Sequence, residues 1–168
     1  MKVKVKVPAT SANLGPGFDV AGLALTLYNT FTFELADQGL NITGCPEQFC
    51  NEENMTYQAF KQAAEICGLE YQGVNIECSG DVPYTRGLGS SSTCIVAGIV
   101  GAFAFKDKAD DRQEILELAT AIEGHPDNVA PAIFGGLTVS VMEEDNVLTL
   151  NIPVKHDYRL SVLIVIHD

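Results

Sequence analysis

The sequence is poor in cations and contains no long hydrophobic run. Lysine and arginine together number 10, against 22 aspartates and glutamates, which gives a net charge of −12. Nucleic-acid binding without regard to base sequence needs clustered cations that displace phosphate counterions, so this class of function is excluded. No apolar stretch approaches the roughly 20 residues of a membrane-spanning helix, and the MKVKVKV start has no apolar signal-peptide core. We therefore expect a cytoplasmic protein that binds neither nucleic acid nor membrane.

Cysteines are few, and their spacing is not that of a metal site. Their number is odd, and no two of them are spaced as C-x-x-C. Two of them fall in apolar, helix-like runs, where a free thiol is an ordinary packing residue. We expect reduced thiols and no zinc site. The five are Cys45, Cys50, Cys67, Cys78 and Cys94.

The rest of the composition is that of a folded domain. Apolar residues make up 46% of the 168 and charged residues 19%, which suffices for the core of one domain. Alternating or β-branched runs predict strands, and apolar residues at helical spacing predict helices. The expected strands cover residues 2–7, 23–35, 74–78, 135–142, 147–152 and 160–166, and the expected helices 55–67, 90–105 and 110–123, with a helical turn at 126–131. Because strands and helices do not alternate strictly, we expect a layered α+β fold.

The most informative stretch is PYTRGLGSSST, residues 83–93, between a predicted strand and a predicted apolar helix. Gly87 and Gly89 allow positive φ and a close approach of the backbone to a ligand. The first turn of the following helix offers unpaired N–H groups, and the hydroxyls of residues 90–93 add further donors, so the stretch predicts an anion cradle. It matches neither the Walker A loop nor the dinucleotide G-x-G-x-x-G pattern. A glycine turn followed by a serine N-cap is the plain structural alternative.

Two further segments carry polar residues in loop-like surroundings. In VPATSANLGPGFDVAGLAL, residues 7–25, Asn13 and Asp19 offer an amide and a carboxylate that could bind an amino group and a hydroxyl. Their alternative is the commoner role of turn or cap residues. The other segment is HPDNVAP, residues 125–131, in which His125 precedes a proline. A lone histidine in such a position is more often structural than catalytic, so we expect a structural role for it.

These three segments resemble motifs of the GHMP kinases, a family of small-molecule kinases. PYTRGLGSSST resembles the family's P-x-x-x-G-L-G-S-S-[AS] loop, and the other two segments resemble the form that homoserine kinases carry. The resemblance implies that the loop binds ATP and that Ser90 or Ser91 lies near Mg²⁺. It also implies that Asn54 lies near the adenine and ribose, although a helix N-cap is an equal alternative there. The implied ATP contacts are Asn54, Pro83, Tyr84, Thr85, Arg86, Gly87, Leu88, Gly89, Ser90, Ser91, Ser92 and Thr93.

The resemblance also implies where the acceptor and the metal bind. Asn13, Asp19 and Asn128 would contact L-homoserine, and Glu117 would be the Mg²⁺ carboxylate, since it precedes Asn128 by eleven residues as in the family. The helical phase of Glu117 alone predicts a solvent-facing side chain, and Glu123 is a competing candidate. Asn128 and Glu117 are the implied catalytic residues. Because an amide takes no proton near neutral pH, positioning and charge stabilisation would supply the catalysis.

The implied fold is the α+β, two-layer N-terminal domain of the GHMP kinases, which resembles the second domain of ribosomal protein S5. It would occupy residues 1–168, and the C-terminal domain that the family carries would be absent, so the chain alone should be inactive. The implied activity is ATP-dependent phosphorylation of L-homoserine in threonine biosynthesis. The alternatives are another GHMP kinase, such as a mevalonate-pathway kinase, or a non-catalytic ligand-binding module on the same fold. The sequence does not determine the oligomeric state, and a homodimer stays open.

Overall fold

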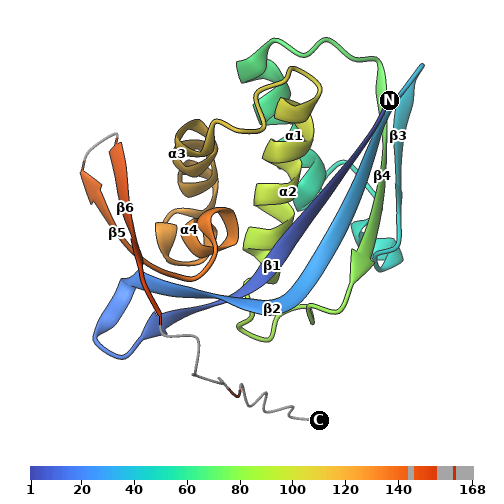
Figure 1. The fold of residues 1–168 in the computed structure, drawn as a ribbon. Helices are drawn as coiled ribbons and strands as arrows, with labels where there is room; N and C mark the ends of the chain where they lie inside the picture. Colours follow the sequence, from blue (N-terminus) through green and yellow to red (C-terminus); the bar gives the residue numbers. More distant parts are fainter. Residues whose placement is uncertain (144–145, 155–160, 162–168) are drawn as a thin grey trace.

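The chain folds as a curved β-sheet around four helices, as a computed structural model shows (Figure 1). The structure describes residues 1–143, 146–154 and 161. Within these residues the strands are β1 (Lys2–Leu14), β2 (Gly17–Ala36), β3 (Gly39–Thr43), β4 (Gly73–Gly80), β5 (Leu137–Glu143) and β6 (Asn146–Ile152). The helices are α1 (Met55–Cys67), α2 (Ser90–Ala104), α3 (Arg112–Glu123) and α4 (Pro126–Phe134), with a 3₁₀ turn η1 (Glu47–Phe49) before α1. The presence of both strands and helices, without strict alternation along the chain, confirms the predicted α+β class.

The long strand β2 holds the sheet together. It pairs antiparallel with β1 over nearly the whole length of β1. It also pairs antiparallel with β5 near its start, through residues 21–23, and with β4 through residues 29–36. Beyond these, β3 lies parallel to β4 and β6 antiparallel to β5. In Figure 1 the β5–β6 hairpin stands on one side of the helices and β3 and β4 on the other, while β1 and β2 run below the helices from one side to the other.

Local signals set the helix ends where the sequence predicts them. The side chain of Asn54 caps α1 by accepting hydrogen bonds from the backbone N–H groups of Thr56 and Tyr57. Gly68 ends the same helix in the left-handed conformation, with φ of 66°. Asp111 caps α3 by accepting from the N–H of Glu114. The predictions of helices at 55–67, 90–105 and 110–123 are confirmed to within two residues.

Strand predictions that depend on a distant partner were less accurate. Residues 8–14 were predicted as a loop, but they continue β1 because β2 pairs with them and takes up the irregularity with its own extra residues. Residues 39–43, for which no element was predicted, form β3 beside β4. The predicted turn at 126–131 is the beginning of α4, which continues to Phe134. Apart from residue 161, the strand predicted at 160–166 falls outside the described residues.

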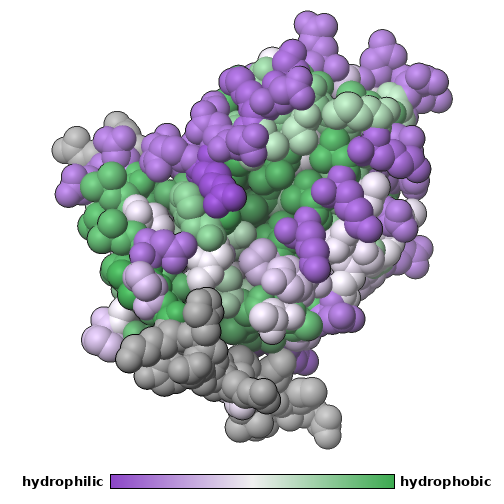
Figure 2. Space-filling model, in the orientation of Figure 1, coloured by the Kyte–Doolittle hydropathy of each residue, from purple (hydrophilic) through white to green (hydrophobic). Residues whose placement is uncertain are grey.

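The core lies between the sheet and helix α2, which is apolar on all sides and sits centrally. The rings of Phe33 on β2 and Phe60 on α1 stack with their centroids 5.5 Å apart, and both side chains are fully buried. By contrast, apolar side chains on the β5–β6 hairpin are exposed, and Figure 2 shows apolar surface gathered there. None of the described helices combines the length and hydropathy of a membrane-spanning segment.

Gly98 allows α1 and α2 to pack at close range, and this gives a test of the fold. A Cβ atom at this position would overlap the carbonyl oxygen of Thr56 and crowd the Cβ of Ala59. Alanine is the better helix former by about 1 kcal/mol, but overpacking a core costs about 1–3 kcal/mol. Gly98→Ala should therefore lower the free energy of unfolding in urea. Ala121→Gly, at an exposed position of α3, measures the effect of helix propensity alone. A higher free energy of unfolding for Gly98→Ala than for the parent chain would contradict this packing.

Candidate nucleotide and acceptor site

Residues 83–93, called the phosphate loop here after their predicted role, border a pocket beside the N-terminus of α2. The pocket has a volume of about 510 Å³. Gly89 immediately precedes the helix in the left-handed conformation, with φ of 65°, so the first N–H groups of α2 face away from the helix body and toward a ligand. The predicted ATP contacts that line the pocket are Asn54, Tyr84, Thr85, Arg86, Gly87, Gly89, Ser90 and Ser91.

Four of the predicted ATP contacts do not line this pocket. Leu88 is buried in a small apolar cluster with Ala9 and Val82. Ser92 and Thr93 are fully buried, and the hydroxyl of Thr93 donates to the carbonyl oxygen of Ser90 at 2.8 Å. Consecutive helical side chains diverge by about 100°, so a run of hydroxyls cannot all face one ligand. The fourth is Pro83, which is also absent from the pocket wall.

Thr10 on β1 connects the phosphate loop to helix α4. Its backbone N–H donates to the carbonyl oxygen of Leu88 at 3.1 Å. Its hydroxyl donates to Oδ1 of Asn128 at 2.8 Å, and the residue is fully buried. A Cβ atom on Gly89 would overlap this hydroxyl, so glycine is required there by contact as well as by φ. The predicted acceptor residue Asn128 is thereby held next to the phosphate loop.

Glu123, and not Glu117, lies at the phosphate loop. The two carboxylate oxygens of Glu123 accept hydrogen bonds from Ser91 at 2.8 Å and from Ser92 at 3.2 Å. Glu117 instead accepts from Gln113 on its own helix at 2.7 Å, and Gln113 also bonds to β6. Six residues on a helix correspond to roughly 9 Å along the axis and about 120° around it, so the two side chains cannot exchange places. Of the two candidate carboxylates, the structure therefore brings Glu123 and not the predicted Glu117 into contact with the hydroxyls of Ser91 and Ser92.

The turn between β1 and β2 positions Asp19. Asn13 and Asp19 both have positive φ, 57° and 55°, a conformation that costs ordinary residues energy but is commonest for asparagine and aspartate. The side-chain oxygen of Asn13 accepts from the N–H of Asp19 at 2.9 Å. Asn13 thus has the turn role that was its structural alternative, and the amide stabilises the position of Asp19.

A second carboxylate, on Asp127, lies beside Asp19. Ligand atoms of Asp19, His125 and Asp127 all lie within 4.8 Å of one another. Nδ1 of His125 is 2.6 Å from Oδ1 of Asp127, which also accepts from the amide of Asn128 at 3.3 Å. Asp127 is fully buried, and its Oδ2 has no hydrogen-bond partner among the described residues. A buried carboxylate oxygen in that state favours a positively charged ligand.

Thr10 and Asp127 were absent from the predicted set, and Glu123 was only the competing candidate to Glu117. Thr10 lies in a stretch that was expected to be a loop, and in the segment 125–131 a substrate contact was expected from Asn128 alone. Their common signal was position, since both lie inside the two segments singled out from the sequence. His125 was considered, and its contact with Asp127 agrees with the structural role expected for it.

Part of the pocket wall is formed by aromatic and sulfur-containing side chains, among them Tyr84 of the phosphate loop itself. The rings of Phe49 and Tyr84 face each other with centroids 6.2 Å apart, and both line the pocket. Asn54 lines it too, although its oxygen is already engaged as the cap of α1. Burial raises the pKa of the Cys78 thiol to about 12, so this part of the wall is uncharged at neutral pH. A pocket that combines an apolar wall with an anion cradle suits a molecule with a flat ring and a phosphate group.

Comparisons with known proteins show which family and fold the chain resembles. Residues 54–136 match the family described as GHMP kinases N terminal domain. The chain is 49% identical over 163 residues to the homoserine kinase of Clostridium beijerinckii, covering 96% of this chain and 55% of that protein. It is similar to the solved homoserine kinase of Cytophaga hutchinsonii, with a TM-score of 0.76 and 30% identity over 92% of this chain and 52% of that one. Mevalonate kinase of Methanococcus jannaschii shares the fold, with a TM-score of 0.70 at 16% identity over 92% of this chain and 56% of that one. The chain spans about half the length of the curated relatives it matches.

The contact between Gly89 and Thr10 predicts different effects for two neighbouring glycines. Both have positive φ, so alanine at either position costs about 1–2 kcal/mol in backbone strain. A Cβ at Gly87 meets open space, whereas one at Gly89 displaces the Thr10 hydroxyl from Asn128. Gly89→Ala should therefore reduce the free energy of unfolding by about 1–3 kcal/mol more than Gly87→Ala does. Equal losses in urea titrations of the two variants would contradict the buried connection.

Proposed function

This chain belongs to the GHMP kinases, whose N-terminal domain it contains, and from that premise we propose that it is the nucleotide-binding half of a homoserine kinase. The reaction is transfer of the γ-phosphate of ATP to the hydroxyl of L-homoserine, which gives O-phospho-L-homoserine in threonine biosynthesis. The proposal rests on the buried hydrogen bonds from Leu88 through Thr10 to Asn128. They join an anion cradle to a polar cluster, as transfer between two bound substrates requires.

ATP binds with its phosphates on the loop and its base against the aromatic wall. The chain carries a net charge of −12, so its overall field disfavours an anion. Local devices must overcome this: the N–H groups at the start of α2, the positive end of its dipole, and the hydroxyls of Ser90 and Ser91. Arg86, on the pocket lining, adds one positive charge. Phe49 and Tyr84 supply the apolar contacts for the base.

Magnesium fits the oxygen atoms that Glu123 and Ser91 bring together. Mg²⁺ prefers carboxylate and hydroxyl oxygens and commonly binds through one carboxylate plus substrate phosphates. The Ser91 hydroxyl already lies 2.8 Å from a Glu123 oxygen, and Ser90 is the next hydroxyl on the pocket lining. When bound, the cation would neutralise charge on the transferred phosphoryl group. Glu123 and Ser91 would hold it there, and Glu117 would have no part in this site.

The acceptor lies in the cluster formed by Asp19, His125, Asp127 and Asn128. Homoserine carries an ammonium group, which suits the two carboxylates and gives Oδ2 of Asp127 the donor that it lacks. Asn128 already accepts from Thr10 and donates one amide hydrogen to Asp127. Its second amide hydrogen can orient the acceptor hydroxyl, but an amide cannot remove a proton. Asn128 therefore positions the nucleophile, and rate enhancement comes from alignment and charge stabilisation.

The proposed activity predicts both a substrate preference and a limit. In a coupled ADP assay with L-homoserine, mevalonate and galactose, a full-length protein with this site should turn over homoserine preferentially. The 168-residue chain should not turn over any of them, because His125, the one basic side chain in the acceptor cluster as described, already contacts Asp127 and the homoserine carboxylate needs a cation. Losing one such charged contact costs about 1.5–3 kcal/mol, or one to two decades in affinity. A full-length relative is the positive control. Preference for mevalonate would refute the acceptor assignment, and full turnover by the chain alone would refute the limit.

The metal assignment predicts that two glutamates on α3 behave differently. Glu123→Gln keeps the shape and removes the charge, so ATP affinity should become nearly independent of Mg²⁺. The ratio of the ATP affinity with Mg²⁺ to the ATP affinity without it should fall by about ten- to a hundredfold. Glu117→Gln, on the same helix, is the matched control and should behave like the parent chain. Calorimetric titration of ATP with and without Mg²⁺ measures both, and the reverse pattern would restore Glu117 as the ligand.

A further inference from the structure

A pair of thiols lies on the rim of the nucleotide pocket and has no role in the proposed reaction. Sγ of Cys45 and Sγ of Cys50 are 3.5 Å apart. Cys50 also donates to the backbone carbonyl oxygens of Cys45 and Pro46, each at 3.7 Å, which keeps its sulfur turned toward its neighbour. Cys50 is exposed and Cys45 is half-buried, so a small oxidant can reach the pair. A disulfide bond of about 2.05 Å would need an approach of only about 1.5 Å.

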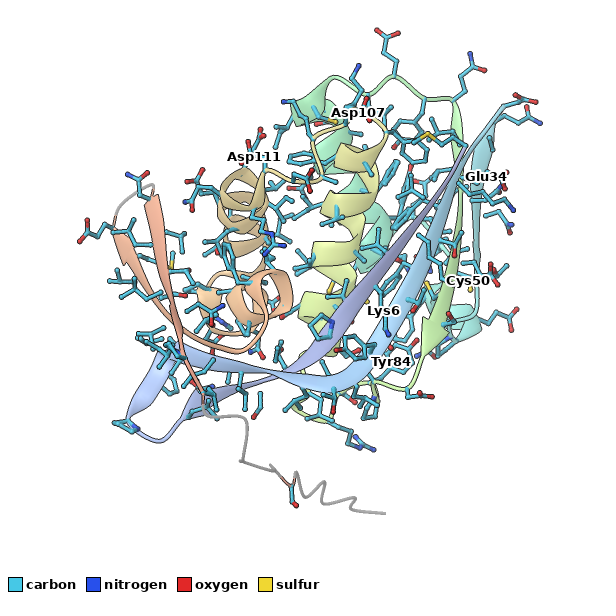
Figure 3. All side chains as sticks on the ribbon, in the orientation of Figure 1. Lys6, Glu34, Cys50, Tyr84, Asp107 and Asp111 are labelled. Atoms are coloured by element: carbon cyan, nitrogen blue, oxygen red, sulfur yellow. The ribbon has the colours of Figure 1, made fainter. Side chains whose placement is uncertain are left out.

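The thiol pair is directly connected to the pocket wall. Cys45 itself lines the pocket, and so does Phe49, the residue before Cys50. Phe49 is half of the aromatic pair with Tyr84, which belongs to the phosphate loop. Figure 3 labels Cys50 on the segment before α1 and Tyr84 on the loop after β4. Closing the two sulfurs would therefore move residues that a bound nucleotide contacts.

We propose that Cys45 and Cys50 are a thiol-oxidation site at which hydrogen peroxide forms a disulfide that weakens nucleotide binding. The Cys50 sulfur attacks one peroxide oxygen, the O–O bond breaks, and the leaving hydroxide departs as water with the thiol proton. The resulting sulfenic acid on Cys50 is attacked by the Cys45 sulfur. The S–S bond forms, the S–O bond breaks, and a second water leaves with the Cys45 proton. Two thiols thus give two electrons to one peroxide.

The order of these steps follows from the surroundings of the two sulfurs. Burial, with the neighbouring Cys50 adding to it, raises the pKa of the Cys45 thiol to about 11, so this thiol is protonated at neutral pH and reacts poorly with peroxide. Cys50 is the exposed member and reacts first. Cys45 is already in contact with it and resolves the sulfenic acid. Cys78, which is half-buried like Cys45 and lines the same wall, stays reduced because Cys50 is the thiol that already lies 3.5 Å from the Cys45 sulfur.

Oxidation of the thiol pair should then weaken ATP binding, and bound ATP should make the pair harder to oxidise. This part rests on the proposed function, because it assumes that ATP fills the pocket and holds Cys45 and Phe49 in their reduced-state positions. Coupling between two sites is reciprocal and commonly amounts to about five- to a hundredfold. We expect about a tenfold loss of ATP affinity on oxidation. By the same linkage, saturating ATP should raise the reduction potential of the pair by about 30 mV.

The chain has a convenient arrangement of cleavage sites for testing this. Tryptic cleavage after Lys6 and Lys61 gives a peptide, 7–61, that contains Cys45 and Cys50 and no other cysteine. After treatment of the 168-residue chain with hydrogen peroxide, this peptide should lose the mass of two hydrogens, about 2 Da, and take up no alkylating agent. Calorimetric titration of Mg²⁺–ATP into the reduced and oxidised chains should show the tenfold difference. Redox titration with and without ATP should show the shift in potential.

Two cysteine variants separate this site from general oxidation. Cys50→Ser should bind ATP as the reduced parent does and should lose all sensitivity to peroxide. Cys67→Ala removes the buried thiol between α1 and α2 and should respond like the parent. A cross-link between peptides 7–61 and 62–86, oxygen addition without a link, or unchanged ATP affinity in the disulfide form would each overturn the proposal. A reduced chain that binds no ATP would refute the proposed function and the coupling alike, whereas the mass of peptide 7–61 would still decide whether the thiols close.

Discussion

The close approach of strand β1 to the phosphate loop determines how the rest of the site is arranged. Thr10 can reach both the carbonyl of Leu88 and the amide of Asn128 only because Gly89 has no side chain to displace it. Thr10 is fully buried, so both of its polar groups must be satisfied within the protein, and losing either bond would leave an unpaired group in the core. The two hydrogen bonds of Thr10 thereby fix the distance between the phosphate loop and helix α4. The geometry of two substrates depends on a strand that contacts neither of them in the proposed reaction.

How well the fold could be predicted depended on how local its determinants are. The ends of α1 follow from Asn54 and Gly68, which act through groups within four residues of themselves, and the sequence predicted them correctly. The second half of β1 has the composition of a loop, and it becomes a strand because β2 pairs with it. Strand β3 is short and forms by parallel pairing with β4, some thirty residues later. Such pairings are long-range consequences of the whole sheet and leave little trace in a single segment.

The same distinction separates the site residues that were predicted from those that were not. The motif predicted a phosphate loop, but it could not tell which of four consecutive hydroxyls face the pocket, since helical geometry turns Ser92 and Thr93 inward. A spacing of eleven residues pointed to Glu117, yet α3 ends at Glu123 and the chain turns at Gly124 before α4 begins. Counting along the sequence assumes a connection of fixed length. Here the last residue of α3 is the one whose side chain reaches the start of α2.

Glu123 also bears on why a protein of such negative charge would bind a nucleotide together with a metal. In the structure its carboxylate accepts hydrogen bonds from Ser91 and Ser92, two residues in the first turn of α2, where phosphates would bind. Phosphate oxygens entering this region would meet a carboxylate of the same sign in a partly desolvated place, and the repulsion at such distances exceeds the help of a single helix dipole. A divalent cation between the phosphate and the carboxylate attracts both and so replaces the repulsion by attraction. The nucleotide and the cation should therefore bind cooperatively, with the carboxylate that opposes the free anion becoming the group that retains the complex.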